Sequence, residues 1–156
     1  MDDPYIHGYV TRLKIVLPCS RKKAWRLIAT PKGLSSWFPA VCKGRVVPGR
    51  SLQFGWTGPI PEDFSDKFRV LAVKKGKSWQ MDWWKTGKVR YSIDGSNPTI
   101  FTLEARYSKS AKGKSFQLPE LAGWSFYLTN LKSVAMNGPD LRNKNPKFSW
   151  KKGFID

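Results

Sequence analysis

Few residues in this sequence are suited to acid–base or nucleophilic catalysis. The chain has one histidine, His7, and two cysteines, Cys19 and Cys42, with no Cys-x-x-Cys pattern. These residues are too few for a structural zinc site, and they form neither a redox motif nor a disulfide framework. A catalytic triad would have to use His7, close to the N-terminus. We therefore expect no catalytic residue, metal or cofactor, and interpret both cysteines as small buried side chains.

Four other titratable residues could act as an acid or a base, namely Asp66, Asp82, Tyr91 and Glu104. General acid–base catalysis needs such a group within hydrogen-bond reach of a bound substrate. Asp82 and Glu104 alternate with apolar neighbours, which predicts that both face solvent and pair with arginines, Arg90 or Arg106, on neighbouring strands. A paired-carboxylate catalytic site is therefore not expected.

Aromatic side chains are abundant, with 8 Trp, 5 Tyr and 9 Phe. Many of them recur at every second residue, so that they share one face of a strand. Such a set either lines a ligand cavity, because small-molecule pockets are mostly apolar, or simply fills the core. The predicted cavity residues are Trp37, Phe54, Trp56, Phe68, Trp79, Trp83, Tyr91, Phe101, Trp124 and Leu128.

Positive charge dominates the composition, since 28 Lys and Arg against 11 Asp and Glu give a net charge of +17. The basic residues are spread over both ends of the predicted sheet, and no helix-turn-helix, zinc-finger or RNA-recognition pattern is present. We expect no sequence-specific nucleic-acid binding. Non-specific contacts with a polyanion remain an alternative to a basic surface that only affects solubility. The residues predicted for such contacts are Lys85, Lys88, Lys109, Lys112 and Lys114.

Periodicity predicts the order of the elements. Residues 8–17 alternate as a strand, Ser20 and Thr30 are suited to cap two short helices, and residues 42–107 read as about six further strands. Residues 118–137 carry an apolar stripe of helical period, with Pro119 in the first turn and Gly138-Pro139 as the stop. No apolar run is long enough to span a membrane and no signal peptide begins the chain, so a cytoplasmic location is expected.

These elements predict an α+β fold. About seven antiparallel strands form a curved sheet around one long C-terminal helix, two short helices follow the first strand, and a cavity lies between sheet and helix. We expect residues 1–142 to form this single domain and residues 143–156 to form a basic tail.

Two segments resemble a known family. The run from Pro18 through Trp25 to Trp37-Phe38 resembles the opening of helix-grip proteins of the SRPBCC (START-like) superfamily. The run from Gly123-Trp124 to Leu131-Lys132, followed by Gly138-x-Asp140-Leu141-Arg142, is similar to their closing helix. Together they match the branch of the C-terminal domain of the heat-shock protein 90 ATPase activator, over residues 8–142.

The resemblance implies a cavity for an apolar or amphipathic small molecule, bound without catalysis. Its alternatives are a chaperone-linked interaction module of the stress response and, less favoured, a cyclase- or hydrolase-type enzyme. The high positive charge and the tail beyond Arg142 depart from the family pattern.

Overall fold

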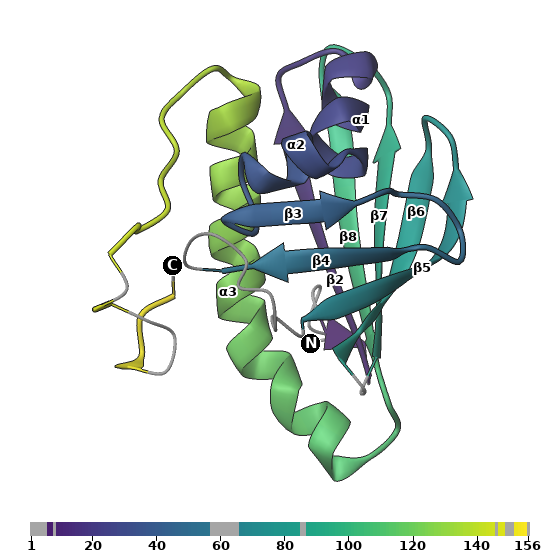
Figure 1. Cartoon of the computed structure of the whole chain (residues 1–156), viewed down its shortest axis with the longest axis vertical. Helices are drawn as coiled ribbons and strands as arrows, with labels where there is room; N and C mark the ends of the chain where they lie inside the picture. Colours follow the sequence, from purple (N-terminus) through teal and green to yellow (C-terminus); the bar gives the residue numbers. More distant parts are fainter. Residues whose placement is uncertain are drawn as a thin grey trace.

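Alternating apolar residues build one antiparallel sheet that curves around a long helix (Figure 1). The computed structural model describes residues 6–7, 9–56, 66–84, 87–145, 147–148 and 152–155. Its strands are β1 (Ile6–His7), β2 (Val10–Leu17), β3 (Val41–Gly44), β4 (Ser51–Gly55), β5 (Lys67–Lys74), β6 (Ser78–Trp83), β7 (Gly87–Asp94) and β8 (Thr99–Tyr107). The helices are α1 (Arg21–Ala29), α2 (Pro31–Ser35) and α3 (Ala111–Ala135).

The strand order β1-β2-β8-β7-β6-β5-β4-β3 places the first long strand beside the last one. All neighbouring pairs run antiparallel, and the six strands from β3 to β8 form a meander. Seven strands have four residues or more, and β1 adds a two-residue edge. The predicted α+β helix-grip fold with about seven strands is therefore confirmed. The sequence Gly58-Pro59-Ile60-Pro61 is typical of a turn, and it lies outside the described residues.

The two short helices begin where the sequence predicts. Ser20 accepts a hydrogen bond from the Lys23 amide as the N-cap of α1, and Thr30 accepts one from the Gly33 amide as the N-cap of α2. Both caps satisfy amide groups that lack a partner inside the helix. Two core tryptophans satisfy carbonyls at the end of α1, because Trp37 Nε1 donates to Leu27 and Trp79 Nε1 donates to Ile28.

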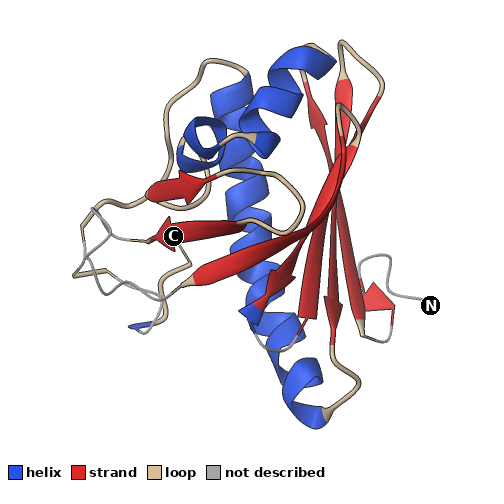
Figure 2. Ribbon diagram, turned by 45° about the vertical axis from the view of Figure 1, so that its right-hand side comes forward, coloured by secondary structure: helices blue, strands red, loops and turns tan. Residues whose placement is uncertain are grey.

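The long helix begins seven residues earlier than predicted, which corrects the expected start at residue 118. Ser110 is the N-cap and accepts a hydrogen bond from the Gly113 amide, so α3 starts at Ala111. Pro119 therefore lies inside the helix rather than in its first turn, and the N-terminal turns of α3 deviate from the axis of the rest (Figures 1 and 2). The polar residues 108–117 hid this extension, because sequence periodicity detects only the apolar stripe.

The end of α3 is a Schellman motif, in which a left-handed residue after the helix lets two amides reach back to its carbonyls. Asn137 has a φ of 58°, and the amides of Asn137 and Gly138 donate to Val134 and Ser133. The helix thus stops before Gly138-Pro139, as predicted, but an asparagine rather than the glycine adopts the left-handed conformation.

Candidate ligand site between the sheet and the long helix

The ten predicted cavity residues all belong to the hydrophobic core or pack against it. Nine of the ten are buried in the core, and Trp56 is half-buried against it. Their rings contact one another in a continuous series, for example Tyr91 and Trp124 at 6.3 Å between centroids and Trp83 and Trp124 at 5.1 Å. The structure therefore brings these residues together, and their role as ligand contacts stays a prediction.

Phe38 lies at the centre of this aromatic cluster, although the sequence analysis did not include it among the cavity residues. Its ring centroid lies 5.0 Å from that of Trp124, 6.0 Å from Trp83 and 5.3 Å from Trp56. It follows the short helix α2, so its position depends on how the loop of residues 37–39 is held.

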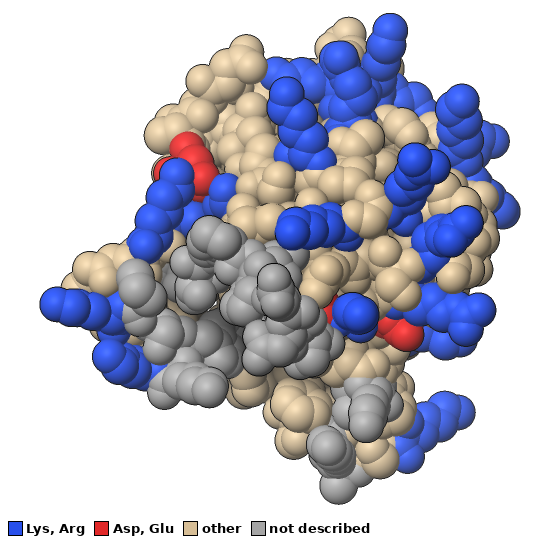
Figure 3. All heavy atoms as spheres, viewed as in Figure 1, with Lys and Arg blue, Asp and Glu red and all other residues tan. Residues whose placement is uncertain are grey.

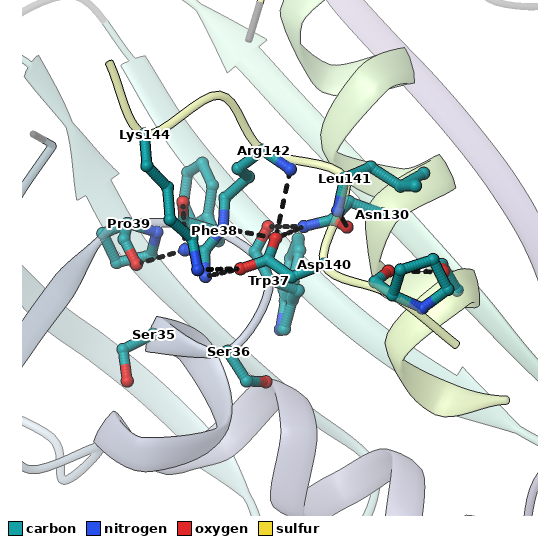
Figure 4. A network of polar contacts seen from close by, with 12 residues as sticks. Ser35, Ser36, Trp37, Phe38, Pro39, Asn130, Asp140, Leu141, Arg142 and Lys144 are labelled. Carbon is teal, nitrogen blue, oxygen red and sulfur yellow. Dashed lines mark hydrogen bonds and ion pairs between the residues drawn. The ribbon is translucent and has the colours of Figure 1, made fainter. Parts of the chain in front are cut away.

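A polar clamp holds this loop against the C-terminal half of α3 (Figure 4). Arg142 Nη1 donates to the carbonyls of Phe38 and Pro39 at 3.3 and 2.8 Å. Asn130, fully buried on α3, donates to the Trp37 carbonyl at 3.0 Å and to Asp140 at 3.1 Å. We call Asn130, Asp140 and Arg142 the clamp. It fixes the backbone that carries the Phe38 ring.

Both charged groups of the clamp, Asp140 and Arg142, have a partner of opposite charge. Arg142 Nη2 donates to Asp140 Oδ2 at 2.7 Å, and Lys144 adds an ion pair at 3.6 Å. Hydrogen bonds from Arg142 hold the pKa of Asp140 well below its usual range. The carboxylate stays ionised and paired, which is typical of a structural contact.

A second carboxyl group, Glu120, faces the opposite end of the core from the first half of α3. Its Oε1 accepts a hydrogen bond from Trp83 Nε1 at 3.0 Å, and its Oε2 accepts one from the Tyr107 hydroxyl at 2.6 Å. The end of β6 supplies Trp83 and the end of β8 supplies Tyr107, which the register places on either side of Gly87. We call Glu120, Tyr107 and Trp83 the Glu120 cluster.

Glu120 differs from Asp140 because no lysine or arginine of the described residues forms an ion pair with it. Burial raises its pKa, although the hydrogen bonds from Tyr107 and Trp83 oppose this effect. Burial likewise raises the pKa of Tyr107, and the charge of Glu120 adds to that shift. The pair can therefore hold a proton in an apolar setting.

Three buried polar atoms of the described residues make no hydrogen bond, namely Thr11 Oγ1, Tyr91 Oη and Gln117 Nε2. Thr11 on β2 faces the Tyr107 hydroxyl, but not in hydrogen-bonding geometry. Gln117 lies on α3 one turn before Glu120 and is 3% exposed. Each such atom costs about 1–3 kcal/mol of stability unless a partner satisfies it.

The structure separates the four acid–base candidates of the sequence. Glu104 faces away from α3 and pairs with Arg12 and Arg106, the second of which was predicted. Asp82 accepts a hydrogen bond from the Arg69 amide instead of pairing with Arg90 or Arg106, and Asp66 accepts one from Trp56 Nε1. Only Tyr91 points into the core, where burial raises its pKa.

The two cysteines are poor nucleophiles. Burial raises the pKa of Cys42 to about 12, and burial also raises the pKa of Cys19 despite the nearby Lys23. Because the thiolate is the reactive form, burial disfavours reaction at both thiols. Among the described residues, no cluster of three or more His, Cys, Asp or Glu side chains could hold a metal ion.

The lysines predicted for polyanion contacts fall near one end of the sheet where they are described. Lys88, Lys109 and Lys114 are exposed there, around the start of β7 and the connection from β8 to α3. Lys85 and the side chain of Lys112 lie outside the described part of the chain. Figure 3 shows basic side chains spread over the visible face rather than gathered in one stripe. Polyanion binding at these lysines stays a prediction.

Glu120 and Gln117 were not predicted as site residues, because both are polar and do not belong to the predicted apolar stripe. Counting back from Trp124 by four and by seven residues reaches Glu120 and Gln117 on the same face of the helix. Glu120 is also the single acidic residue of α3. An isolated carboxyl group on a buried helical face is the signal that could have identified the cluster.

The curved sheet packs around α3, with aromatic rings and unpartnered polar groups between them. This arrangement is typical of a ligand-binding or interaction module of the helix-grip class. The family model for the activator of Hsp90 ATPase homolog 1-like protein matches residues 18–135. The chain therefore belongs to this family, within the SRPBCC superfamily. None of the described helices has the length and apolar character that crossing a membrane requires.

Solved structures share the fold at low sequence identity. Protein NE0264 from Nitrosomonas europaea has 18% identity and a TM-score of 0.72, over 86% of this chain and 99% of its own. Protein SSP2350 from Staphylococcus saprophyticus has 14% identity and a TM-score of 0.70, over 85% and 96%. The Aha1 dimer from Colwellia psychrerythraea has 19% identity and a TM-score of 0.66, over 81% and 95%. A comparison with curated proteins finds no match.

Proposed function

We propose that the protein binds an apolar or amphipathic small molecule between the concave face of the sheet and α3, without catalysing a reaction. The observation that carries this proposal is the set of unpartnered buried atoms, Thr11 Oγ1, Tyr91 Oη and Gln117 Nε2. Natural interiors satisfy nearly all buried polar groups, so three unsatisfied ones in one small domain favour a ligand or ordered water as the missing partner.

The aromatic cluster would contact the apolar body of this molecule. The Glu120 cluster, with Gln117 and Thr11 beside it, would receive its polar group. Glu120 accepts hydrogen bonds and Gln117 donates them, so the matching group is one that does both, such as a hydroxyl. Tyr91 marks the other end of the site, because its ring contacts Trp124, which in turn contacts Trp83.

The variant Tyr91→Phe tests this proposal with two opposite effects. Removing an unsatisfied hydroxyl should stabilise the unliganded protein by about 1 kcal/mol. The same change should weaken binding of a long-chain alcohol or a hydrophobic dye about fivefold or more, since one hydrogen bond to the ligand is lost. Urea unfolding and fluorescence titration measure the two effects.

Leu118→Ala is the matched control, because Leu118 is 72% exposed on the same helix and contributes nothing to the core. It should leave ligand affinity unchanged. A protein that binds no dye, fatty acid or alcohol, and that is not stabilised by Tyr91→Phe, would rule the proposal out.

A second candidate function is supported by the family, whose name refers to the ATPase of the chaperone Hsp90. As an interaction module the protein would use exposed side chains rather than its core. Exposed apolar residues such as Trp84, Phe116 and Leu118 could contribute. Retention of the chaperone on immobilised protein at low salt, lost in a Phe116→Ser/Leu118→Ser variant and kept in Tyr91→Phe, would favour this function over ligand binding.

A further inference from the structure

The outer face of the sheet, opposite the candidate ligand site, carries a shallow pocket of about 290 Å³ over β5 to β8. It lies where the register between β5 and β6 shifts between Val70 and Ala72. Small side chains line the pocket at this irregularity, including Ala72 and Ser78. The rim is formed by longer residues, so the depression follows from side-chain size as well as from the bulge.

Three cations surround this pocket, namely Lys74, Arg90 and Arg106. Arg90 is exposed, and it forms no ion pair with any residue that the structure describes. The strand register places Gln80, Arg90 and Glu104 side by side on successive strands. Ser78 and Gln80 add neutral hydrogen-bond donors to the positive charges.

The one carboxylate of the pocket is already neutralised. Glu104 accepts a hydrogen bond from Arg12 at 2.7 Å and from Arg106 at 2.8 Å. Burial alone would raise the pKa of Glu104, but these two arginines outweigh it and hold the pKa below its usual range. Around this single negative charge stand Arg12, Arg106, Arg90 and Lys74, so the pocket keeps an excess of positive charge.

We propose that this pocket binds a phosphate monoester or a free phosphate ion. The pocket has room for a compact oxyanion of charge near −2, which would match its uncompensated positive charge. Guanidinium groups bind such oxyanions through paired, parallel hydrogen bonds, and Arg90 forms no ion pair with a described residue that would compete. The site is independent of the proposed ligand in the core, because it lies on the other face of the sheet.

The double variant Lys74→Gln/Arg90→Gln tests the pocket, since both side chains are exposed and neither holds another element of the described chain in place. We expect inorganic phosphate and glycerol 3-phosphate to bind the wild-type protein at one saturable site. Amide shifts measured by nuclear magnetic resonance should concentrate on residues 72–80 and on Arg90. The double variant should weaken this binding at least tenfold.

The control is Lys43→Gln/Arg50→Gln, which removes the same charge from exposed positions near β3 and β4. It should change the affinity less than twofold. Tighter binding of glycerol 3-phosphate than of inorganic phosphate would identify an organic phosphate as the ligand, and equal binding would identify the free ion. Equal weakening in both double variants, or binding only of an oligonucleotide, would overturn the proposal in favour of diffuse attraction by the net charge.

Discussion

Two carboxyl groups lie at opposite ends of α3, Asp140 beside its C-terminal half and Glu120 on its N-terminal half. They differ in their hydrogen-bond partners, in their neighbouring charges and in the direction of their pKa shifts. Asp140 meets the C-terminal half of the helix through Asn130, and a guanidinium group binds both of its oxygens. Glu120 belongs to the N-terminal half and has an indole and a phenol as partners, with no cation among the described residues. One pKa is lowered by hydrogen bonds from Arg142, and the other is raised by burial.

This difference separates a structural contact from a candidate binding site. In the clamp, each charged group has a partner, so the interaction stabilises the loop that carries Phe38. Around Glu120, the atoms Thr11 Oγ1 and Gln117 Nε2 have no hydrogen-bond partner among the described residues. Functional sites are expected where local stability is not optimised, because their groups are arranged for a ligand.

The largest effect should come from removing the arginine of the clamp. Arg142→Ala leaves Asp140 with only the exposed Lys144 as a cation and removes the donor to the Pro39 carbonyl, and we expect a loss of about 3 kcal/mol in the free energy of unfolding. Lys144→Ala is the matched control, because Lys144 is 77% exposed and pairs with the same carboxylate at 3.6 Å. It should cost at most about 0.5 kcal/mol. Equal effects in urea unfolding would show that the clamp is not structural.

The same chemical change at both carboxyl groups gives the next largest effect. Asp140→Asn should cost about 2 kcal/mol near neutral pH, since a charge-assisted interaction with Arg142 becomes a weaker one. Glu120→Gln keeps an acceptor oxygen and removes a buried charge, so stability should change by less than about 0.5 kcal/mol or rise. A loss at Glu120→Gln as large as that at Asp140→Asn would remove the distinction between the two sites.

The two carboxyl groups should also give pH dependences of opposite sign. The pKa of Asp140 is depressed by folding, so its contribution is present above the usual aspartate range and is lost as pH falls towards the folded value. The pKa of Glu120 is raised, so the folded state favours the protonated form, and its contribution is lost as pH rises through the folded pKa.

Unfolding free energies measured from pH 3 to pH 8 check this prediction. Relative to the wild-type protein, Asp140→Asn should be less stable at pH 8, and Glu120→Gln should be equally or more stable there. Both differences should shrink as pH falls. A difference for Glu120→Gln that stays constant over the whole range would show that this carboxyl group does not change its protonation on folding.

Most of the fold could be predicted from the sequence because its signals are local. Alternating residues such as Trp79, Met81 and Trp83 gave the strands and their buried face, and Ser20 and Thr30 gave the starts of both short helices. The start of α3 could not be predicted, because its first turns are polar and Pro119 is tolerated inside the helix.

The candidate site was predicted only in its apolar part. Rings such as Phe54, Phe101 and Trp124 follow strand and helix periodicity, so a core position is visible in the sequence. The pairing of Glu120 with Tyr107 and Trp83 brings three elements together through tertiary packing, which no local pattern records. The clamp likewise depends on Arg142 reaching a loop about a hundred residues away along the chain.

Tyr107→Phe removes a single hydrogen bond and should report directly on Glu120. The change removes the hydroxyl that donates to Glu120 Oε2 at 2.6 Å, and one such hydrogen bond contributes about 1 kcal/mol. Because this hydrogen bond favours the ionised carboxyl group, its loss should raise the pKa of Glu120 further. The indole N–H of Trp83, which donates to the same carboxyl group, reports on this titration by nuclear magnetic resonance. Its resonance, assigned with Trp83→Phe, should titrate at a higher pH in Tyr107→Phe than in the wild-type protein.

Ser133→Ala is the control, because it removes a hydroxyl that donates to the Pro139 carbonyl beside the clamp and should leave the titration unchanged. A Trp83 resonance that titrates at or below the usual glutamate range in both proteins would show that burial does not raise the pKa of Glu120, and the comparison between the two ends of α3 would then fail.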